Sequence, residues 1–115
     1  MSFISLLLTS CSRREKEKLL EVWFFDVGQG DAILINFPDD TCMLIDAGDN
    51  HTEKALIKAL SDMGVDNIDR LVGTHPDSDH IGGIDGIISN FDIGDVYLPD
   101  IQANTNAYDN MINEL

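Results

Sequence analysis

Apolar residues gather in short runs along the first half of the chain, separated by polar turn residues. The runs at 19–27, 32–37 and 41–45 are rich in aromatic and β-branched residues, and Gly28-Gln29-Gly30-Asp31 and Pro38-Asp39-Asp40 separate them. Such runs, bounded by turn signals, predict strands. Because the connections are short, we expect the three strands to be neighbours in an antiparallel meander.

The spacing of apolar residues changes after residue 51. They recur three and four positions apart within 52–63, which predicts a helix, and a further strand is predicted at 68–73. Strand, helix, strand predicts a right-handed crossover between parallel strands. The rest of the chain predicts a helix at 84–89, a strand at 96–98 and a last helix from Tyr108. The predicted fold class is therefore α/β.

The length and charge of the chain limit its size to one domain and limit the kinds of ligand that it can bind. The chain has 115 residues, enough for one small domain, and its 43% hydrophobic content suffices for a core. The net charge is -14, and beyond residue 19 the only cations are Lys54, Lys58 and Arg70. Such a surface repels nucleic-acid backbones, suits divalent cations and favours solubility.

The first residues predict a membrane-proximal segment. An apolar run at 3–8 is too short to span a bilayer, and Leu8-Thr9-Ser10-Cys11 resembles a bacterial lipobox followed by a charged spacer. We expect residues 1–19 to be a lipoprotein signal and tether, with lipidation at Cys11, and residues 20–115 to be an extracytoplasmic, membrane-anchored domain. The alternative is a membrane-proximal fragment of a longer protein.

Several features have ordinary structural interpretations. Cys42 falls inside an apolar strand, which favours a buried, inert thiol. His51 is interpreted as a solvated loop histidine, with indirect support of a site as the alternative. A dinucleotide-binding loop beginning at Gly28 would need a small residue where Ile33 stands, and an EF-hand would need a glutamate at Ile88.

The most informative stretch is 73–83, which holds His75, Asp77, Asp79 and His80. Two carboxylates and two imidazoles make a poor core because buried charges need partners, and a divalent cation is such a partner. The alternative is an acidic surface turn with incidental histidines.

The local backbone predicts how these side chains converge. Pro76 biases His75 toward an extended conformation, in which residues two apart point the same way. A helix beginning at Ser78 or Asp79 would then turn His80 to a neighbouring side. We expect one cation at His75 and Asp77, and a second at Asp79 and His80.

Three further acids stand near predicted strand ends, where α/β sheets commonly place sites. These are Asp26, Asp31 and Asp46. Each is either part of a site or a turn residue; the turn interpretation is favoured for Asp31, and neither is favoured for Asp26 or Asp46.

Three motifs together carry a family resemblance. The segment from His75 to Gly83 resembles the His-x-His-x-Asp-His signature of the metallo-β-lactamase superfamily, with Asp77 in place of the second histidine. With Phe25-Asp-Val-Gly-Gln-Gly-Asp-Ala32 and Leu44-Ile-Asp-Ala-Gly48, it resembles the metallo-hydrolase domain of the ComEC family of DNA-uptake competence proteins.

That resemblance implies a fold and a site. The fold would be an αββα sandwich, of which this chain has the N-terminal half, because the family's later histidine ligands have no counterpart after His80. Two divalent ions would bind at His75, Asp77, Asp79 and His80, with Asp79 also orienting the water. The residues that support the site would be Asp26, Gln29, Asp31 and Asp46.

The expected chemistry is hydrolysis of a phosphodiester such as DNA. Asp77 makes the site richer in oxygen, which moves the expected metal from zinc toward manganese or a mixed site. Asp77 and the Asp26–Asp31 motif disfavour a lactamase or thioesterase. The alternatives are a non-catalytic metal-binding remnant and a half-domain completed by a second chain.

Overall fold

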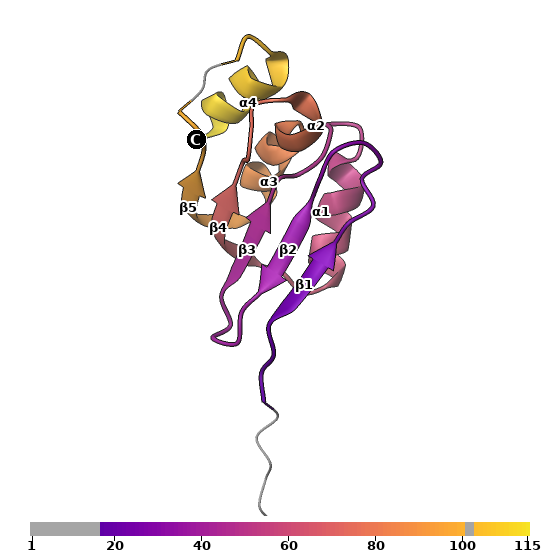
Figure 1. Cartoon of the computed structure of the whole chain (residues 1–115), viewed down its shortest axis with the longest axis vertical. Coiled ribbons are helices and arrows are strands. Elements are labelled where there is room, and N and C mark those ends of the chain that lie inside the picture. Colours follow the sequence, from indigo (N-terminus) through magenta and orange to yellow (C-terminus); the bar gives the residue numbers. More distant parts are fainter. Residues whose placement is uncertain (1–16, 101–102) are drawn as a thin grey trace, which may run out of the picture.

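The computed structural model describes residues 17–100 and 103–115, and its centre is one five-stranded mixed sheet (Figure 1). The strands follow in sequence order: β1 (Glu21–Phe24), β2 (Ile33–Asn36), β3 (Cys42–Ile45), β4 (Asn67–Val72) and β5 (Asp92–Tyr97). β1, β2 and β3 pair antiparallel, as the meander predicted, whereas β3, β4 and β5 pair parallel. The parallel pairing of β3 with β4 confirms the predicted crossover.

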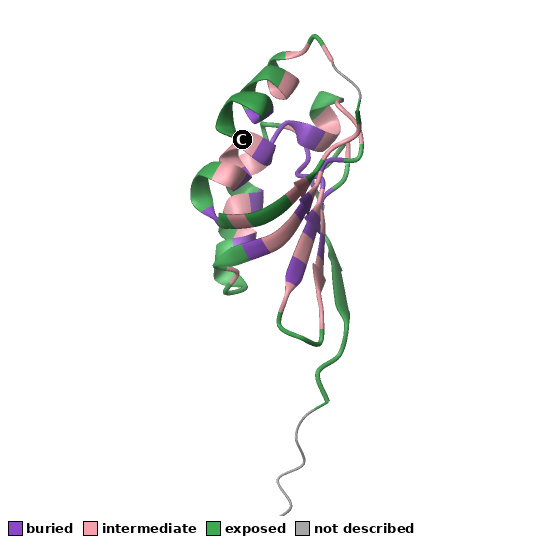
Figure 2. Ribbon diagram, turned by 90° about the vertical axis from the view of Figure 1, so that its left-hand side faces the viewer, coloured by how far each residue is buried: buried purple, intermediate pink, exposed green. Residues whose placement is uncertain are grey.

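The described helices are α1 (Glu53–Asp62), α2 (Ser78–Ile81), α3 (Ile84–Asn90) and α4 (Asn106–Glu114). Figure 2 shows α1, α3 and α4 on one side of the sheet and none of them on the other. This is a mixed α/β layer pair. The predicted helices at 52–63 and 84–89 are confirmed within a residue or two at their ends.

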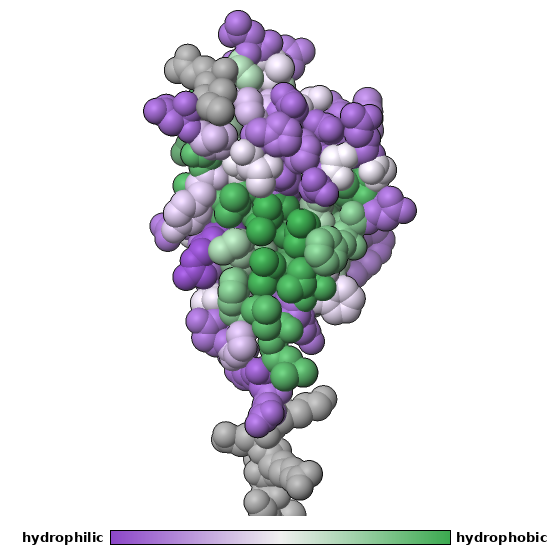
Figure 3. Space-filling view, viewed as in Figure 1, coloured by the Kyte–Doolittle hydropathy of each residue, from purple (hydrophilic) through white to green (hydrophobic). Residues whose placement is uncertain are grey.

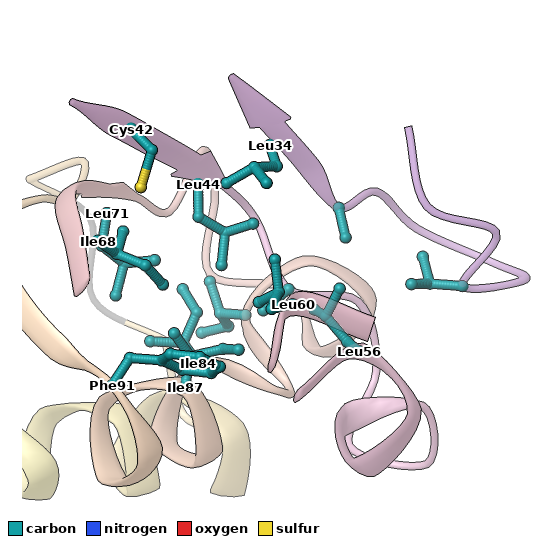
Figure 4. Packing of buried hydrophobic residues seen from close by; sticks show 14 of the residues in the cluster. Leu34, Cys42, Leu44, Leu56, Leu60, Ile68, Leu71, Ile84, Ile87 and Phe91 are labelled. Carbon is teal, nitrogen blue, oxygen red and sulfur yellow. The ribbon is translucent and has the colours of Figure 1, made fainter. Parts of the chain in front are cut away.

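The hydrophobic core lies between the sheet and these helices (Figure 4). Leu34, Leu44 and Leu71 are register neighbours on β2, β3 and β4, and each is fully buried. Leu60 of α1 and Ile87 of α3 pack beneath them. The alternation of buried and half-buried positions along β2 and β3 follows because one face packs on helices and the other has none of the described helices over it.

The opposite side of the sheet is named the open face. It consists of the side chains that alternate with the buried ones, and most are apolar. Its apolar members are Val22, Phe24, Ile33, Ile35, Met43, Ile45, Val72 and Tyr97. Its charged members include Arg70 and Asp95, which are register partners.

Two predicted strands differ from the structure. The first was expected at 19–27, but β1 spans Glu21–Phe24 because its partner β2 ends at Asn36, just before the Pro38 turn. The strand predicted at 96–98 is β5, which begins earlier, at Asp92. Its acids and Gly94 are poor strand formers and hid it. Gly94 is needed there because a Cβ would lie 2.4 Å from the carbonyl oxygen of Asp69.

Cys42 is buried, as predicted, and desolvation raises the pKa of its thiol above the usual range. Its Sγ donates to the carbonyl oxygen of Asn67 at 3.1 Å, and its backbone N–H donates to Asp69 Oδ2 at 2.7 Å. The buried, hydrogen-bonded thiol of Cys42 therefore fits the predicted structural role.

None of the helices in the described ranges is long and apolar enough to cross a membrane. Cys11, the predicted lipidation site, lies outside the described residues.

We expect Glu53→Gln to stabilise the protein slightly at pH 7. Desolvation, with Asp85 nearby, raises the pKa of the Glu53 carboxyl, so ionising it opposes folding. The penalty is absent below the carboxyl's ordinary pKa and grows as pH rises through the raised value. Because the group is largely in water, the gain should stay below about 1 kcal/mol. Urea unfolding at pH 7 and pH 3.5 checks this, and an equal gain at both pH values would contradict it.

Candidate metal centre

The candidate site lies at one end of the sheet, where β3 and β4 both finish. Asp46 follows β3, and the loop from Gly73 leads from β4 into α2 (Figure 1). Backbone hydrogen bonds join the two segments: Asp46 N donates to Val72 O and Ala47 N donates to His80 O, both at 2.8 Å. The chain thus brings together residues about 30 positions apart in the sequence at the carboxyl edge of parallel strands.

The compact part of the site is formed by His75, Asp79 and His80. One donor atom from each lies within 4.8 Å of the other two, and all three side chains are partly buried. The two imidazole rings have centroids 3.8 Å apart, and Asp79 Oδ2 lies 3.8 Å from His80 Nε2. Two imidazoles and a carboxylate at this separation form a ligand set typical of zinc or manganese.

The buried Asp46 carboxylate holds the compact group in place through hydrogen bonds. It is 2% exposed and has a left-handed backbone (φ 58°), a conformation that aspartate tolerates better than most residues. Its Oδ1 accepts from Thr74 N–H at 2.7 Å, and its Oδ2 accepts from the Thr74 hydroxyl at 2.5 Å and from His80 Nδ1 at 2.9 Å. Both oxygens are therefore engaged, which fixes the carboxylate in place.

These contacts set the tautomers of both histidines. A carboxylate only accepts, so His80 carries its proton on Nδ1 and presents the Nε2 lone pair on its other side. The Thr74 hydroxyl donates its one proton to Asp46, so its oxygen accepts from His75 Nδ1, 3.2 Å away. His75 then also presents Nε2 as a lone pair. Orientation of metal-binding imidazoles through their other nitrogen is the usual arrangement in proteins.

Thr74 was not among the residues that the sequence analysis singled out. Its position in the sequence, directly before His75 and directly after a predicted strand, could have indicated its role. A hydroxyl there can bond to a neighbouring strand end as well as to the histidine that follows. The sequence alone did not show that Asp46 would be that partner.

A second group joins Asp31, Asp46 and His80. Here Asp31 Oδ2 lies 3.7 Å from His80 Nδ1. Because Nδ1 carries the proton shared with Asp46, this group is a hydrogen-bond network more than a cation site. Asp31 nevertheless lies beside the site, so the turn interpretation favoured for it is incomplete.

Each histidine has the acid that the sequence paired with it nearby, and the division into two ion sites stays a prediction. Asp79 joins both His75 and His80, whereas Asp77 is exposed and lies outside the compact group. Asp77 Oδ2 is 3.4 Å from His75 Nε2, so it stays within reach of an ion held by that nitrogen. The reason is that α2 begins at Ser78, which turns Asp79 back toward both rings.

The remaining predicted residues lie at different distances from the centre. Gln29 Nε2 donates to Asp79 Oδ2 at 3.4 Å, so this loop touches the site. Asp26 belongs to neither candidate ligand group of the described residues, and its Oδ1 accepts from Gly28 N–H at 3.2 Å, a contact within the turn. His51 is exposed, with 91% of its side chain accessible, as expected for a solvated loop histidine.

A hollow of about 410 Å³ opens beside Asp79. Polar side chains from three segments line most of it: Gln29, Asp49, His51, Thr52, Ser78 and Asp79, with Val27. Its amide, hydroxyl and imidazole groups are hydrogen-bond donors that suit a polar ligand.

The residues present fit a divalent cation. A ligand atom from each of His75, Asp79 and His80 lies within 4.8 Å of the other two, and Asp31 and Asp77 lie beside the histidines. In the described part of the chain, every ion-pair contact of these acids is to a histidine and none is to Lys or Arg. Carboxylates without a basic partner leave a negative site that a metal ion would neutralise.

Comparison with known proteins identifies the family. The model of the metallo-beta-lactamase superfamily matches residues 25–109, more than half of the chain. Among solved structures, a metallo-β-lactamase with an HARLDQ motif from Cronobacter sakazakii is similar in fold, with a TM-score of 0.54 and 22% identity. The match covers 63% of this chain and 29% of that one, so this chain spans less than a third of its length. No curated protein matches significantly. The chain belongs to the metallo-β-lactamase superfamily.

Proposed function

We propose that this chain is a metal-dependent hydrolase of the ComEC-like type, acting on phosphodiester bonds. One observation carries the proposal: His75, Asp79 and His80 converge, and both imidazoles have their Nδ1 atoms engaged by Thr74 and Asp46. That arrangement leaves the Nε2 atoms of both imidazoles available as ligands close to the Asp79 carboxylate. Superfamily membership is consistent with hydrolysis, since most members are hydrolases.

His75, Asp79 and His80 would hold one divalent ion, and Asp77 would contribute to a second, with Mn²⁺ or Zn²⁺ as the expected metals. Bound there, such ions supply an activated water and neutralise the charge that develops on a phosphoryl group. The protein's own part is orientation. Asp46 and Thr74 hold the imidazoles, and the amide of Gln29 holds Asp79.

The hollow beside Asp79 supports a polar substrate. Gln29 and Ser78 place donors around it, beside the carboxylates of Asp49 and Asp79, and amide and hydroxyl donors of this kind bind phosphate oxygens. The net charge of -14 opposes long nucleic acids, because each additional phosphate meets the same negative field. A short oligonucleotide or a small phosphodiester therefore suits this chain better than duplex DNA.

Metal titration of the full chain, followed by hydrolysis of bis(p-nitrophenyl) phosphate with Mn²⁺ or Zn²⁺, tests the proposal. We expect His80→Ala to weaken metal binding at least 100-fold and abolish turnover, because it removes one donor and frees Asp46. His51→Ala is the matched control, since that exposed histidine is outside the compact group, and it should leave metal affinity unchanged. Equal affinity in both variants would contradict the assignment.

The competing proposal is a non-catalytic half-domain that needs a second chain to complete its site. The fact in its favour is the short coverage of the Cronobacter sakazakii structure. Metal binding that is lost in His80→Ala, without turnover of any phosphodiester offered, would favour it. Turnover that depends on the metal and on His80 would exclude it.

A further inference from the structure

We propose that the hollow beside Asp79 holds the ribose of a nucleotide substrate, and that the Asp49 carboxylate binds its hydroxyl groups. This inference rests on the proposed hydrolysis of phosphodiesters and names the part of the substrate that the hollow takes. The hollow measures about 410 Å³, within the size range of small-molecule sites, and Asp79, one of its lining residues, belongs to the candidate metal centre.

The hollow lies toward the helix side of the sheet. Val27 belongs to the core between the sheet and the helices, and Thr52 directly precedes α1, which covers that side (Figure 2). The open face, whose apolar side chains are visible in Figure 3, contributes none of the described lining residues. Three segments of this chain therefore form the walls of the hollow: the loop at 27–29, the turn at 49–52 and the start of α2.

Backbone contacts hold these three segments together. Gly48 N donates to Asp31 O at 2.9 Å, which ties the turn to the loop that precedes β2. A Cβ at Gly82 would lie 3.0 Å from Asp49 Cα, so the turn also packs closely against the end of α2. Because α2 carries Asp79 as well, the position of Asp49 relative to the metal centre is fixed by the fold.

Asp49 is held by its own turn and keeps one carboxylate oxygen for a ligand. Its Oδ1 accepts from His51 N–H at 2.9 Å, and its carbonyl oxygen accepts from the N–H and the hydroxyl of Thr52. Among the described residues no hydrogen bond uses Oδ2, and 32% of the side chain is accessible. A half-buried carboxylate oxygen of this kind suits a ligand group that donates a hydrogen bond.

The charges of the hollow favour hydroxyl groups over a second phosphate. Asp49 and Asp79 both line it, and none of its described lining residues is Lys or Arg. A phosphate beside Asp49 would meet a like charge, whereas a sugar hydroxyl is neutral and donates to the carboxylate. Carboxylates bind ribose hydroxyls in this way in dinucleotide-binding domains. The scissile phosphate is then left at the Asp79 end, next to Gln29 and Ser78.

Two measurements on the full chain with Mn²⁺ bound test this inference. Calorimetric titration compares the Kd of adenosine 5′-monophosphate with that of its 2′,3′-dideoxy analogue, and hydrolysis of the p-nitrophenyl ester of each compares kcat/KM. In that hydrolysis water adds to phosphorus, the P–O bond to p-nitrophenolate breaks, and the nucleoside monophosphate is released. We expect the two hydroxyls to improve Kd and kcat/KM by about tenfold or more, because hydrogen bonds to a charged group are the stronger ones.

Asp49→Asn removes the charged acceptor and keeps the turn, because an amide oxygen can still accept from His51 N–H. The preference for ribose should fall to about threefold, since a neutral hydrogen bond has roughly half the strength of a charge-assisted one. Mn²⁺ affinity should be retained. Asp62→Asn is the matched control, because it makes the same change at an exposed residue at the other end of α1, and it should keep the full preference.

The two measurements separate this inference from the proposed function. Turnover with equal Kd and equal kcat/KM for the two sugars would overturn the ribose site and leave the hydrolase in place. A Kd preference that Asp49→Asn lowers, without turnover of either ester, would support the ribose site and count against the hydrolase. The same preference in Asp49→Asn as in the unmodified chain, or no binding of either nucleotide, would overturn the inference.

Discussion

Replacing Asp46 with asparagine is expected to lower both stability and metal affinity, although the two side chains have almost the same shape. Asp46 accepts three hydrogen bonds, two from Thr74 and one from His80, at a site with 2% exposure. Asparagine offers one oxygen and an NH₂ group, so at least one of these donors would face another donor. Loss of a buried, charge-assisted hydrogen bond costs about 2–3 kcal/mol.

The effect on metal binding follows from the tautomer of His80. With an amide in place of the carboxylate, the NH₂ group can donate to His80 Nδ1, which moves the imidazole proton to Nε2. That nitrogen would then have no lone pair for an ion. Loss of such an orienting partner typically weakens metal binding by ~10–100-fold. Urea unfolding of the metal-free chain and calorimetric titration with Mn²⁺ or Zn²⁺ separate the two effects.

Asp40→Asn is a matched control for this change. Asp40 also has a left-handed backbone (φ 67°), but it is exposed in the Pro38–Asp40 turn and its ion pair with Lys18 is at the surface. The same substitution there should change stability by less than about 0.5 kcal/mol. Normal metal affinity in Asp46→Asn would show that the hydrogen bond to His80 does not orient the ring.

Hydrophobic periodicity predicted the local part of this fold correctly. The helix at α1 followed from residues three and four apart, and the meander followed from short connections between apolar runs. β5 was the exception, because Asp92 and Asp95 are poor strand formers. Its position is set by pairing with β4, a contact with residues 25 positions earlier that no local pattern encodes.

The sequence indicated which residues are candidates for the site, but it indicated less about how they are arranged. Spacing alone singled out His75, Asp77, Asp79 and His80 because few structural roles need four such side chains together. Which of them converge depends on where α2 begins and on what lies beneath, and Asp46 is supplied by a different strand end. Long-range contacts of this kind need the folded chain.

The loop that holds Gln29 and Gly30 packs directly against α2, so a substitution at Gly30 is expected to change both stability and metal binding. Gly30 has φ 94°, and a Cβ there would lie 1.7 Å from the carbonyl oxygen of Asp79 and 2.6 Å from its carbonyl carbon. These are backbone atoms, so no side chain can rotate away to make room. We expect Gly30→Ala to displace either this loop or the start of α2, and to shift Asp79 away from His75 and His80.

Gly28→Ala separates that steric clash from the cost of the backbone conformation. Gly28 also has a positive φ (72°), but nothing lies within 4 Å of its Cβ position. Gly28→Ala should lower the free energy of unfolding only by the cost of a left-handed backbone, about 1–2 kcal/mol, and should retain metal affinity. Gly30→Ala adds an overpacking cost of about 1–3 kcal/mol and should also lose metal affinity. Urea unfolding and Mn²⁺ titration of both variants measure the difference. Equal losses would mean that the loop does not hold Asp79 in place, and that α2 positions its own ligands unaided.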